Sequence, residues 1–219
     1  MVEISTSLLS VEKEKIIKTI YNLETSSTDY FHIDVMDGKF VENNTTELMK
    51  EYANAIKQIS NIPLDIHLMV ENVKEFIDEY SGLEPNTITF HIEATKSKEE
   101  VMEYIRQIKE VGAKVGISVK PNTNIEEIYE FLPYIHTCLV MTVEPGLGGQ
   151  KLIPETLDKV KKLKEYIESN NLEIDIEVDG GINSETIEMA KEAGANIFVV
   201  GSALVKAENY EEVIDELRN

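Results

Sequence analysis

Positive charge and cysteine are both scarce in this chain of 219 residues. Lysine and arginine together number 21 against 41 aspartates and glutamates, so the formal net charge is −20. A chain this acidic argues against nucleic acid and against anionic membranes as partners. Cys138 is the single cysteine, which excludes an internal disulfide and is typical of a protein from a reducing compartment.

Segments that would direct the chain into or across a membrane are also missing. The first residues contain no basic stretch followed by an apolar one, and no apolar run is long enough to span a bilayer. We therefore expect a cytoplasmic protein. No linker, low-complexity tract or shift in composition interrupts the sequence, so residues 1–219 are predicted to form one domain.

The sequence instead alternates regularly between β-rich runs and segments with helical spacing of apolar residues. Strands are predicted at residues 2–6, 30–38 (with its closing Asp-Gly turn), 64–68, 87–91, 114–118, 137–143, 174–178 and 196–200. Helices are predicted at residues 11–23, 46–59, 73–80, 97–111, 125–131, 154–169, 183–194 and 203–217. Eight strand–helix units predict an α/β fold, a single (β/α)8 TIM barrel.

A doubly wound open sheet is the main alternative to the barrel. Such a sheet usually carries a glycine-rich turn after its first strand. The corresponding loop here, residues 7–10, contains no glycine. The barrel is therefore the favoured fold.

Imidazoles and carboxylates gather at the predicted strand ends. His32 and Asp34 are two residues apart in an apolar run, so both point to the same face of their strand. His67 ends the third strand, and Asp179 follows the seventh. These positions share the C-terminal face of a barrel, where four such side chains can surround one divalent metal ion. The alternative is that His32 and Asp34 pair with each other or with backbone groups.

Two further sets of residues are predicted to contact a substrate at the same face. Glycines follow the seventh and eighth strands, where barrels frequently bind phosphate: Gly180, Gly181, Gly201 and the adjoining Ser202. The loop after the sixth strand is a candidate lid, which contains Gly146, Leu147, Gly148 and Gly149. The alternatives are ordinary tight turns and a flexible connector.

Several other residues near the strand ends have a structural interpretation as well as a functional one. Met36, Met69 and Met141 either fill gaps in the core or form an apolar wall that excludes water. His91 is either a further site residue or, as we favour, a packed, hydrogen-bonded histidine. His136 and Cys138 are also assigned structural roles.

Together these segments resemble the ribulose-phosphate 3-epimerase family over nearly the whole chain. The motifs that carry the resemblance are HIDVMDG (32–38), DIHLMV (65–70), HIEAT (91–95), VMTVEPG (140–146), EVDGGI (177–182) and GSA (201–203). The resemblance implies interconversion of D-ribulose 5-phosphate and D-xylulose 5-phosphate, through an enediolate, in the pentose phosphate pathway. It also implies a divalent zinc, iron, manganese or cobalt ion, with the ligands His32, Asp34, His67 and Asp179.

The same resemblance implies that Asp34 and Asp179 act as acid and base, and that Ser7 contacts the substrate. The chemistry agrees, because inverting a carbon next to a carbonyl requires one group on each face of the substrate, and these carboxylates come from well-separated strands. His67 is predicted to contact the substrate as well. No organic cofactor is signalled, and no strand ends in a lysine that would form a Schiff base.

The chain departs from the family's usual sequence in three loops near the substrate. Thr6 replaces a proline, residues 39–43 read Lys-Phe-Val-Glu-Asn where His-Phe-Val-Pro-Asn is common, and Leu147 replaces a phenylalanine. An allulose-6-phosphate 3-epimerase of the same mechanism and a non-catalytic phosphosugar-binding barrel therefore remain alternatives. We also expect a homo-oligomer, because barrels of this size often associate.

Overall fold

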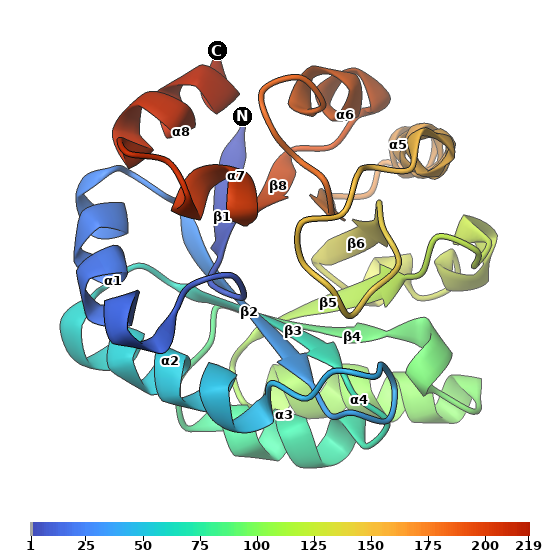
Figure 1. The fold of residues 1–219 in the computed structure, drawn as a ribbon. Helices are drawn as coiled ribbons and strands as arrows, with labels where there is room; N and C mark the ends of the chain where they lie inside the picture. The colour runs from blue at the N-terminus through green and yellow to red at the C-terminus, as the bar shows by residue number, and fades with distance from the viewer. Residues whose placement is uncertain (1) are drawn as a thin grey trace.

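Eight parallel strands close into a barrel inside a ring of helices in the computed structural model, which describes residues 2–219 (Figure 1). Neighbouring strands pair in sequence order, and the first strand closes the barrel against the eighth. The strands are β1 (Glu3–Ser7), β2 (Tyr30–Met36), β3 (Leu64–Met69), β4 (Thr87–His91), β5 (Lys114–Val119), β6 (Thr137–Met141), β7 (Asp175–Asp179) and β8 (Ile197–Val200). The predicted (β/α)8 fold is confirmed.

Helices follow the strands and cover the outside of the barrel (Figure 1). The α-helices are α1 (Ile16–Thr25), α2 (Thr46–Ile59), α3 (Val73–Ser81), α4 (Lys98–Glu110), α5 (Leu157–Ser169), α6 (Ile187–Ala193), α7 (Ser202–Val205) and α8 (Tyr210–Arg218). Short 3₁₀ segments are η1 (Lys13–Lys15), η2 (Ile92–Ala94), η3 (Ile125–Ile128), η4 (Leu132–Tyr134) and η5 (Pro154–Thr156).

Two of the predicted helices are wrong. The closing helix predicted at 203–217 is divided into α7 and α8, because Asn209 Oδ1 accepts hydrogen bonds from the backbone N–H groups of Glu211 and Glu212 and so begins a new helix. In place of the helix predicted at 125–131 the chain forms only the 3₁₀ segment η3, which is followed by η4. Pro133 lies in η4 and has no N–H with which to extend an α-helical ladder.

Five strands end one or two residues away from the prediction. Strands β1, β3, β5 and β7 each run one residue further than predicted, so Ser7 and Asp179 are the last residues of β1 and β7. Strand β6 ends at Met141, two residues early. Residues 142 and 143 therefore belong to the loop after β6, which lies at the C-terminal face.

The main hydrophobic core lies between the strands and the helices. Along β2, fully buried Phe31, Ile33 and Val35 belong to this outer layer and alternate with His32 and Asp34, which point to the barrel axis. The same alternation leaves the inside of the barrel unusually polar. Apart from Thr6, which alternates with Ser5 and Ser7, the buried polar residues on the strands are Ser5, Ser7, His32, Asp34, Asp65, His67, Thr87, Thr89, His91, Ser118, Thr137 and Glu177.

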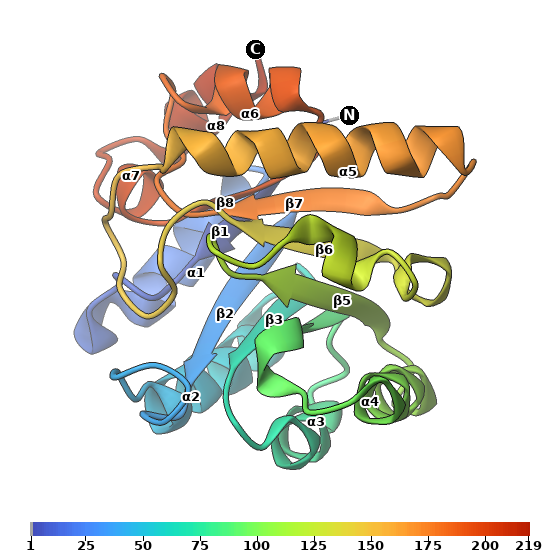
Figure 2. The same cartoon turned by 90° about the vertical axis from the view of Figure 1, so that its right-hand side faces the viewer.

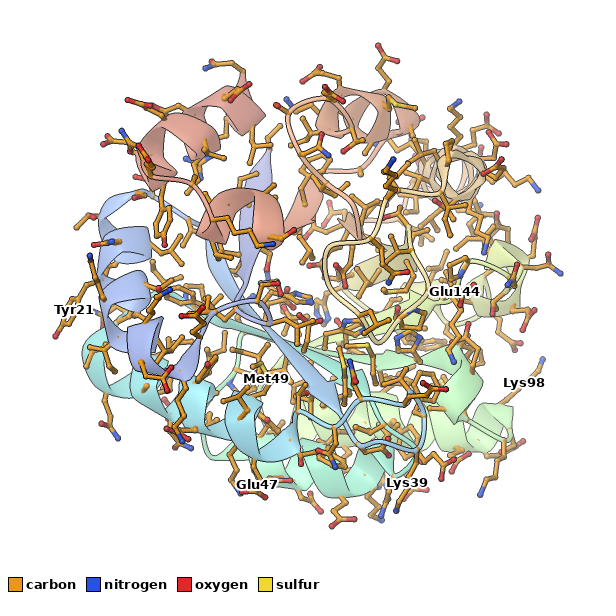
Figure 3. All side chains as sticks on the ribbon, viewed as in Figure 1. Tyr21, Lys39, Glu47, Met49, Lys98 and Glu144 are labelled. Carbon is orange, nitrogen blue, oxygen red and sulfur yellow. The ribbon has the colours of Figure 1, made fainter. Side chains whose placement is uncertain are left out.

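The C-terminal ends of the strands gather at one end of the barrel, where the site is expected. Figure 2 shows α7, the loop after β6 and the loop after β2 together at this end, on the left of the view. Side chains such as Tyr21 and Lys98 project outward on opposite sides of the helix ring (Figure 3). Among residues 2–219, none of the helices has both the length and the apolar character that crossing a membrane requires.

We expect two isoleucine-to-alanine substitutions to differ sharply in their effect on stability. Ile88 on β4 is fully buried in the outer core layer, whereas Ile17 on α1 is 47% exposed. Replacing Ile88 with alanine should lower the free energy of unfolding by about 2–5 kcal/mol, because a cavity is left behind. Replacing Ile17 should change it by less than about 0.5 kcal/mol. Urea unfolding measures both, and equal losses would contradict the assignment of the core.

Candidate metal centre and active site

Four of the predicted side chains meet at the C-terminal end of the barrel. One donor atom from each of His32, Asp34, His67 and Asp179 lies within 4.8 Å of the other three. The strand register explains why these side chains lie close together. Asp34 on β2 is level with His67 on β3, and His32 lies two residues earlier on the same face. Asp179 reaches the same point from β7.

The spacing of the four donor atoms fits a bound cation. His32 Nε2 lies 3.4 Å from Asp34 Oδ1 and 3.9 Å from Asp179 Oδ2. His67 Nδ1 lies 3.4 and 3.6 Å from the same two oxygens. Donors held 2.0–2.1 Å from a tetrahedral zinc ion would be about 3.3 Å apart. These residues therefore fit a divalent metal ion.

The hydrogen-bond inventory supports the same interpretation. Both histidine rings are fully buried, yet His32 Nε2 and His67 Nδ1 have no hydrogen-bond partner in the described residues. A buried polar atom without a partner costs free energy. Two such nitrogens that face two carboxylates are the arrangement that a cation would satisfy.

Three of the four ligand candidates are held from their other side by a second group. His32 Nδ1 lies 2.6 Å from Asp65 Oδ2, and Asp34 Oδ2 accepts a hydrogen bond of 2.7 Å from the Ser7 hydroxyl. His67 Nε2 lies 2.9 Å from His91 Nε2. Such contacts orient the ligands of a metal and leave only their inner atoms free.

The electrostatic environment keeps Asp34 ionised. Burial by itself would raise the pKa of Asp34, but His32 and His67 outweigh it and hold this pKa well below its usual range. Burial also disfavours the charged form of His32, and the neighbouring Asp65 and Asp34 outweigh that effect, so the pKa of His32 is raised. Burial and the nearby Asp65 raise the pKa of Glu177 well above its usual value.

Asp65 and Glu177 form an acidic layer beneath the centre that the sequence interpretation missed. Both are buried, and His32 Nδ1 lies 3.7 Å from Glu177 Oε1. A signal for them exists in the sequence, because Asp65 stands two residues before His67, and Glu177 stands two residues before Asp179. Strand spacing therefore directs both carboxyl groups to the barrel axis.

A cavity of about 70 Å³ opens at this end of the barrel, and Asp34 and Asp179 are among the residues that line it. Met36, Met69 and Met141 form part of its wall. Most of the predicted substrate contacts line it too: Ser7, Gly146, Leu147, Gly148, Gly149, Gly180, Gly181, Gly201 and Ser202. His67 does not line the cavity and is fully buried, although it is also predicted to contact the substrate.

The glycines after β7 are required by the close approach of the loop after β6. Gly181 has φ +70°, and a Cβ atom there would lie 2.2 Å from the backbone nitrogen of Leu152. Gly180 has φ +122°, and a Cβ atom there would meet Val143 at 2.3 Å. Residues with side chains are strained in this conformation and have no room, so the two loops can pack together only through glycine.

The candidate lid, residues 143–150, is held against the loop after β2. Asn43 Nδ2 donates a hydrogen bond of 2.7 Å to the carbonyl of Gly146, a contact that the sequence interpretation did not include. Within the lid, Gln150 Nε2 donates to the carbonyls of Glu144 and Leu147. Leu147 is 65% exposed at the tip. The mobility of this loop stays a prediction.

The fold and this cluster of side chains define a (β/α)8 barrel enzyme, since barrel enzymes have their active sites at this face. The family model for the ribulose-phosphate 3 epimerase family matches residues 3–205. The chain therefore belongs to the ribulose-phosphate 3-epimerase family, as its motifs predicted, and it is an epimerase.

Curated relatives agree with the family assignment. The chain is 42% identical over 193 residues to the ribulose-phosphate 3-epimerase of Mycobacterium bovis, covering 88% of this chain and 82% of the relative. It is 39% identical over 218 residues to that of Methanocaldococcus jannaschii, covering 100% and 90%. The crystal structure of 3-hexulose-6-phosphate synthase from Salmonella typhimurium shares the fold, with a TM-score of 0.69, 18% identity, and coverage of 99% and 96%.

We expect Gly181→Ala to destabilise the protein and Gly82→Ala to be harmless. The added methyl group at residue 181 would collide with the backbone of Leu152 in a left-handed conformation, at a cost of more than about 1 kcal/mol. Gly82 ends α3 at φ −66° with open space around it, so alanine there should stabilise by up to about 1 kcal/mol. Thermal melting of the two variants tests this difference, and a Gly181→Ala protein as stable as the wild type would contradict the packing described.

Proposed function

We propose that this enzyme interconverts D-ribulose 5-phosphate and D-xylulose 5-phosphate and that it uses one divalent metal ion. Membership of the family supports the reaction. The observation that carries the metal proposal is the pair of unpartnered, buried nitrogens, His32 Nε2 and His67 Nδ1, facing the carboxylates of Asp34 and Asp179. Imidazole and carboxylate donors suit zinc, iron, manganese or cobalt.

A bound divalent ion would polarise the substrate's carbonyl and adjacent hydroxyl, and so make the neighbouring C–H bond more acidic. The remaining steps are assigned to the chain itself. One carboxylate, Asp34 or Asp179, removes the proton from carbon 3 on one face of the sugar. The other carboxylate delivers a proton to the opposite face, which inverts the centre.

The surroundings of the two carboxylates support these roles. Asp34 is held in its ionised form, which is the form that can accept a proton. Because Ser7 lines the cavity and donates to Asp34 Oδ2, we assign proton transfer to that oxygen. Asp34 comes from β2 and Asp179 from β7, and the strands β1 and β8 lie between them in the barrel. The two carboxylates can therefore flank a flat intermediate. The methionine wall would keep bulk water from the site.

We further propose that the phosphate binds to the loops after β7 and β8. A chain with a net charge of −20 has to attract an anionic substrate locally. Backbone N–H groups at Gly180, Gly181, Gly201 and Ser202 are available for this purpose, because these residues line the cavity and glycine allows a close approach. The lid would close over the sugar. A cytoplasmic location and self-association are also part of this proposal.

The first test is an epimerase assay before and after removal of metal. Purified enzyme should convert D-ribulose 5-phosphate to D-xylulose 5-phosphate. Dialysis against a chelator should reduce the rate by at least about 10²-fold, because the charge on the substrate oxygens would lose its stabilisation. Adding zinc, iron, manganese or cobalt back should restore the rate.

Two results of this assay would contradict the proposal. A large preference for D-allulose 6-phosphate in a parallel assay would assign the site to a six-carbon sugar. Full activity after complete chelation, verified by metal analysis of the same sample, would remove the metal from the reaction. Isotope exchange tests the remaining alternative, a barrel that binds the sugar phosphate without turnover. Such a protein would release no carbon-bound deuterium from labelled substrate.

The second test compares aspartate-to-asparagine substitutions at the two ends of β7. Asp179→Asn should lower the rate of epimerisation by at least about 10²-fold, because an amide cannot accept or return the proton. Asp175→Asn is a matched control at the other end of the same strand, where the side chain only accepts a hydrogen bond from Asn196. It should keep the wild-type rate. Near-normal turnover by Asp179→Asn would take this residue out of the proton transfer.

A further inference from the structure

His91 lies directly behind His67, away from the cavity. It is the last residue of β4 and is fully buried. Its Nε2 atom is 2.9 Å from His67 Nε2, and the two rings are stacked with centroids 5.0 Å apart. The ring of Phe40 covers His91 at 4.9 Å, and Lys120 Nζ lies 3.8 Å above the centre of that ring. His91 is thus held tightly without lining the cavity.

The hydrogen bonds around His91 fix which nitrogen donates at each step. To hold a cation, His67 Nδ1 must carry no proton, so the proton of the neutral ring is on Nε2. His67 Nε2 therefore donates to His91 Nε2, which accepts. The proton of neutral His91 is then on Nδ1, from where it donates to Glu93 Oε2 at 3.1 Å.

Glu93 can end this chain of hydrogen bonds because an ionised carboxylate only accepts. Its Oε1 accepts from the backbone N–H of Lys120 at 2.7 Å and from the hydroxyl of Thr123. The loop that supplies these donors is itself anchored. Lys159 Nζ donates to three of its carbonyls, those of Lys120, Pro121 and Thr123.

We propose that His91 and Glu93 are positioning residues, which fix His67 in the Nε2–H tautomer and turn its Nδ1 atom toward the other donors. The inference rests on the proposed metal site and extends it beyond the four donor residues. His32 gains the same support from Asp65 in one step. His67 needs two residues, because the carboxylate that ends its chain, that of Glu93, lies in η2 after β4 and is held there by the loop after β5.

The test is the affinity of the purified protein for cobalt(II), measured by competition with a chelating indicator. His91→Phe removes the acceptor for His67 and should weaken binding by about 10- to 100-fold. His91→Gln provides a carbonyl oxygen for His67 and an amide for Glu93, so it should bind nearly as the wild type does. His136→Phe is a matched control, because His136 precedes β6 at the opposite end of the barrel. It should not change the affinity.

A second measurement needs no variant and so does not depend on the folding of His91→Phe. Long-range ¹H–¹⁵N spectra of ¹⁵N-histidine-labelled wild-type protein, with zinc bound, should assign the proton of His67 to Nε2 and that of His91 to Nδ1. A His91 proton on Nε2 would overturn the inference. Wild-type affinity in His91→Phe would overturn it too, as would an equal loss in His91→Gln, which would indicate packing alone.

These measurements also distinguish this inference from the proposed function. A wild-type protein with no affinity for cobalt or zinc would overturn both the inference and the metal proposal. A protein that binds metal with the expected tautomers, but does not epimerise D-ribulose 5-phosphate, would overturn the proposed function and support the inference.

Discussion

The burial of imidazoles and carboxylates at the mouth of the barrel is the constraint on which the rest of the site depends. His32, His67 and Asp34 are at most 4% exposed, and an unpaired polar atom at that depth is costly. The fold supplies one partner behind each of them: Asp65, His91 and Ser7, respectively. The atoms left without a partner all face one point, where Asp179 completes the set. A single cation would therefore satisfy groups that three strands bring together.

Because side chains alternate along each strand, the residues that stabilise the fold and those that form the site lie on opposite faces of the sheet. Barrel interiors are usually filled by layers of branched apolar side chains. Here much of the interior is polar, and most of the apolar core lies in the layer between strands and helices. Phe31 and Val35 contribute to that layer from the same strand that turns His32 and Asp34 inward. The outer layer can therefore stabilise a barrel whose inner face is given over to hydrogen bonds and ion pairs.

Much of this organisation is predictable because strand spacing is a local property. The period of two that pairs His32 with Asp34 also predicts a carboxylate at Asp65 beneath His67, although the sequence interpretation left it out. Contacts between distant loops are different. The hydrogen bond from Asn43 to Gly146 joins residues 103 positions apart, and no local pattern encodes it. The prediction of a single closing helix is wrong for the opposite reason. The helical periodicity is continuous there, but a local cap at Asn209 begins a new helix.

The two imidazoles of the metal centre, His32 and His67, differ in the length of the hydrogen-bonded chain that orients them. His32 is supported directly by Asp65, a carboxylate on the neighbouring strand inside the barrel. The orientation of the His32 ring therefore depends on strand geometry. The support of His67 passes through His91 to Glu93, whose carboxylate is held by the loop after β5. That loop is anchored in turn by a lysine from α5. The orientation of one buried ring is thus tied to packing outside the barrel, whereas the orientation of the other is not.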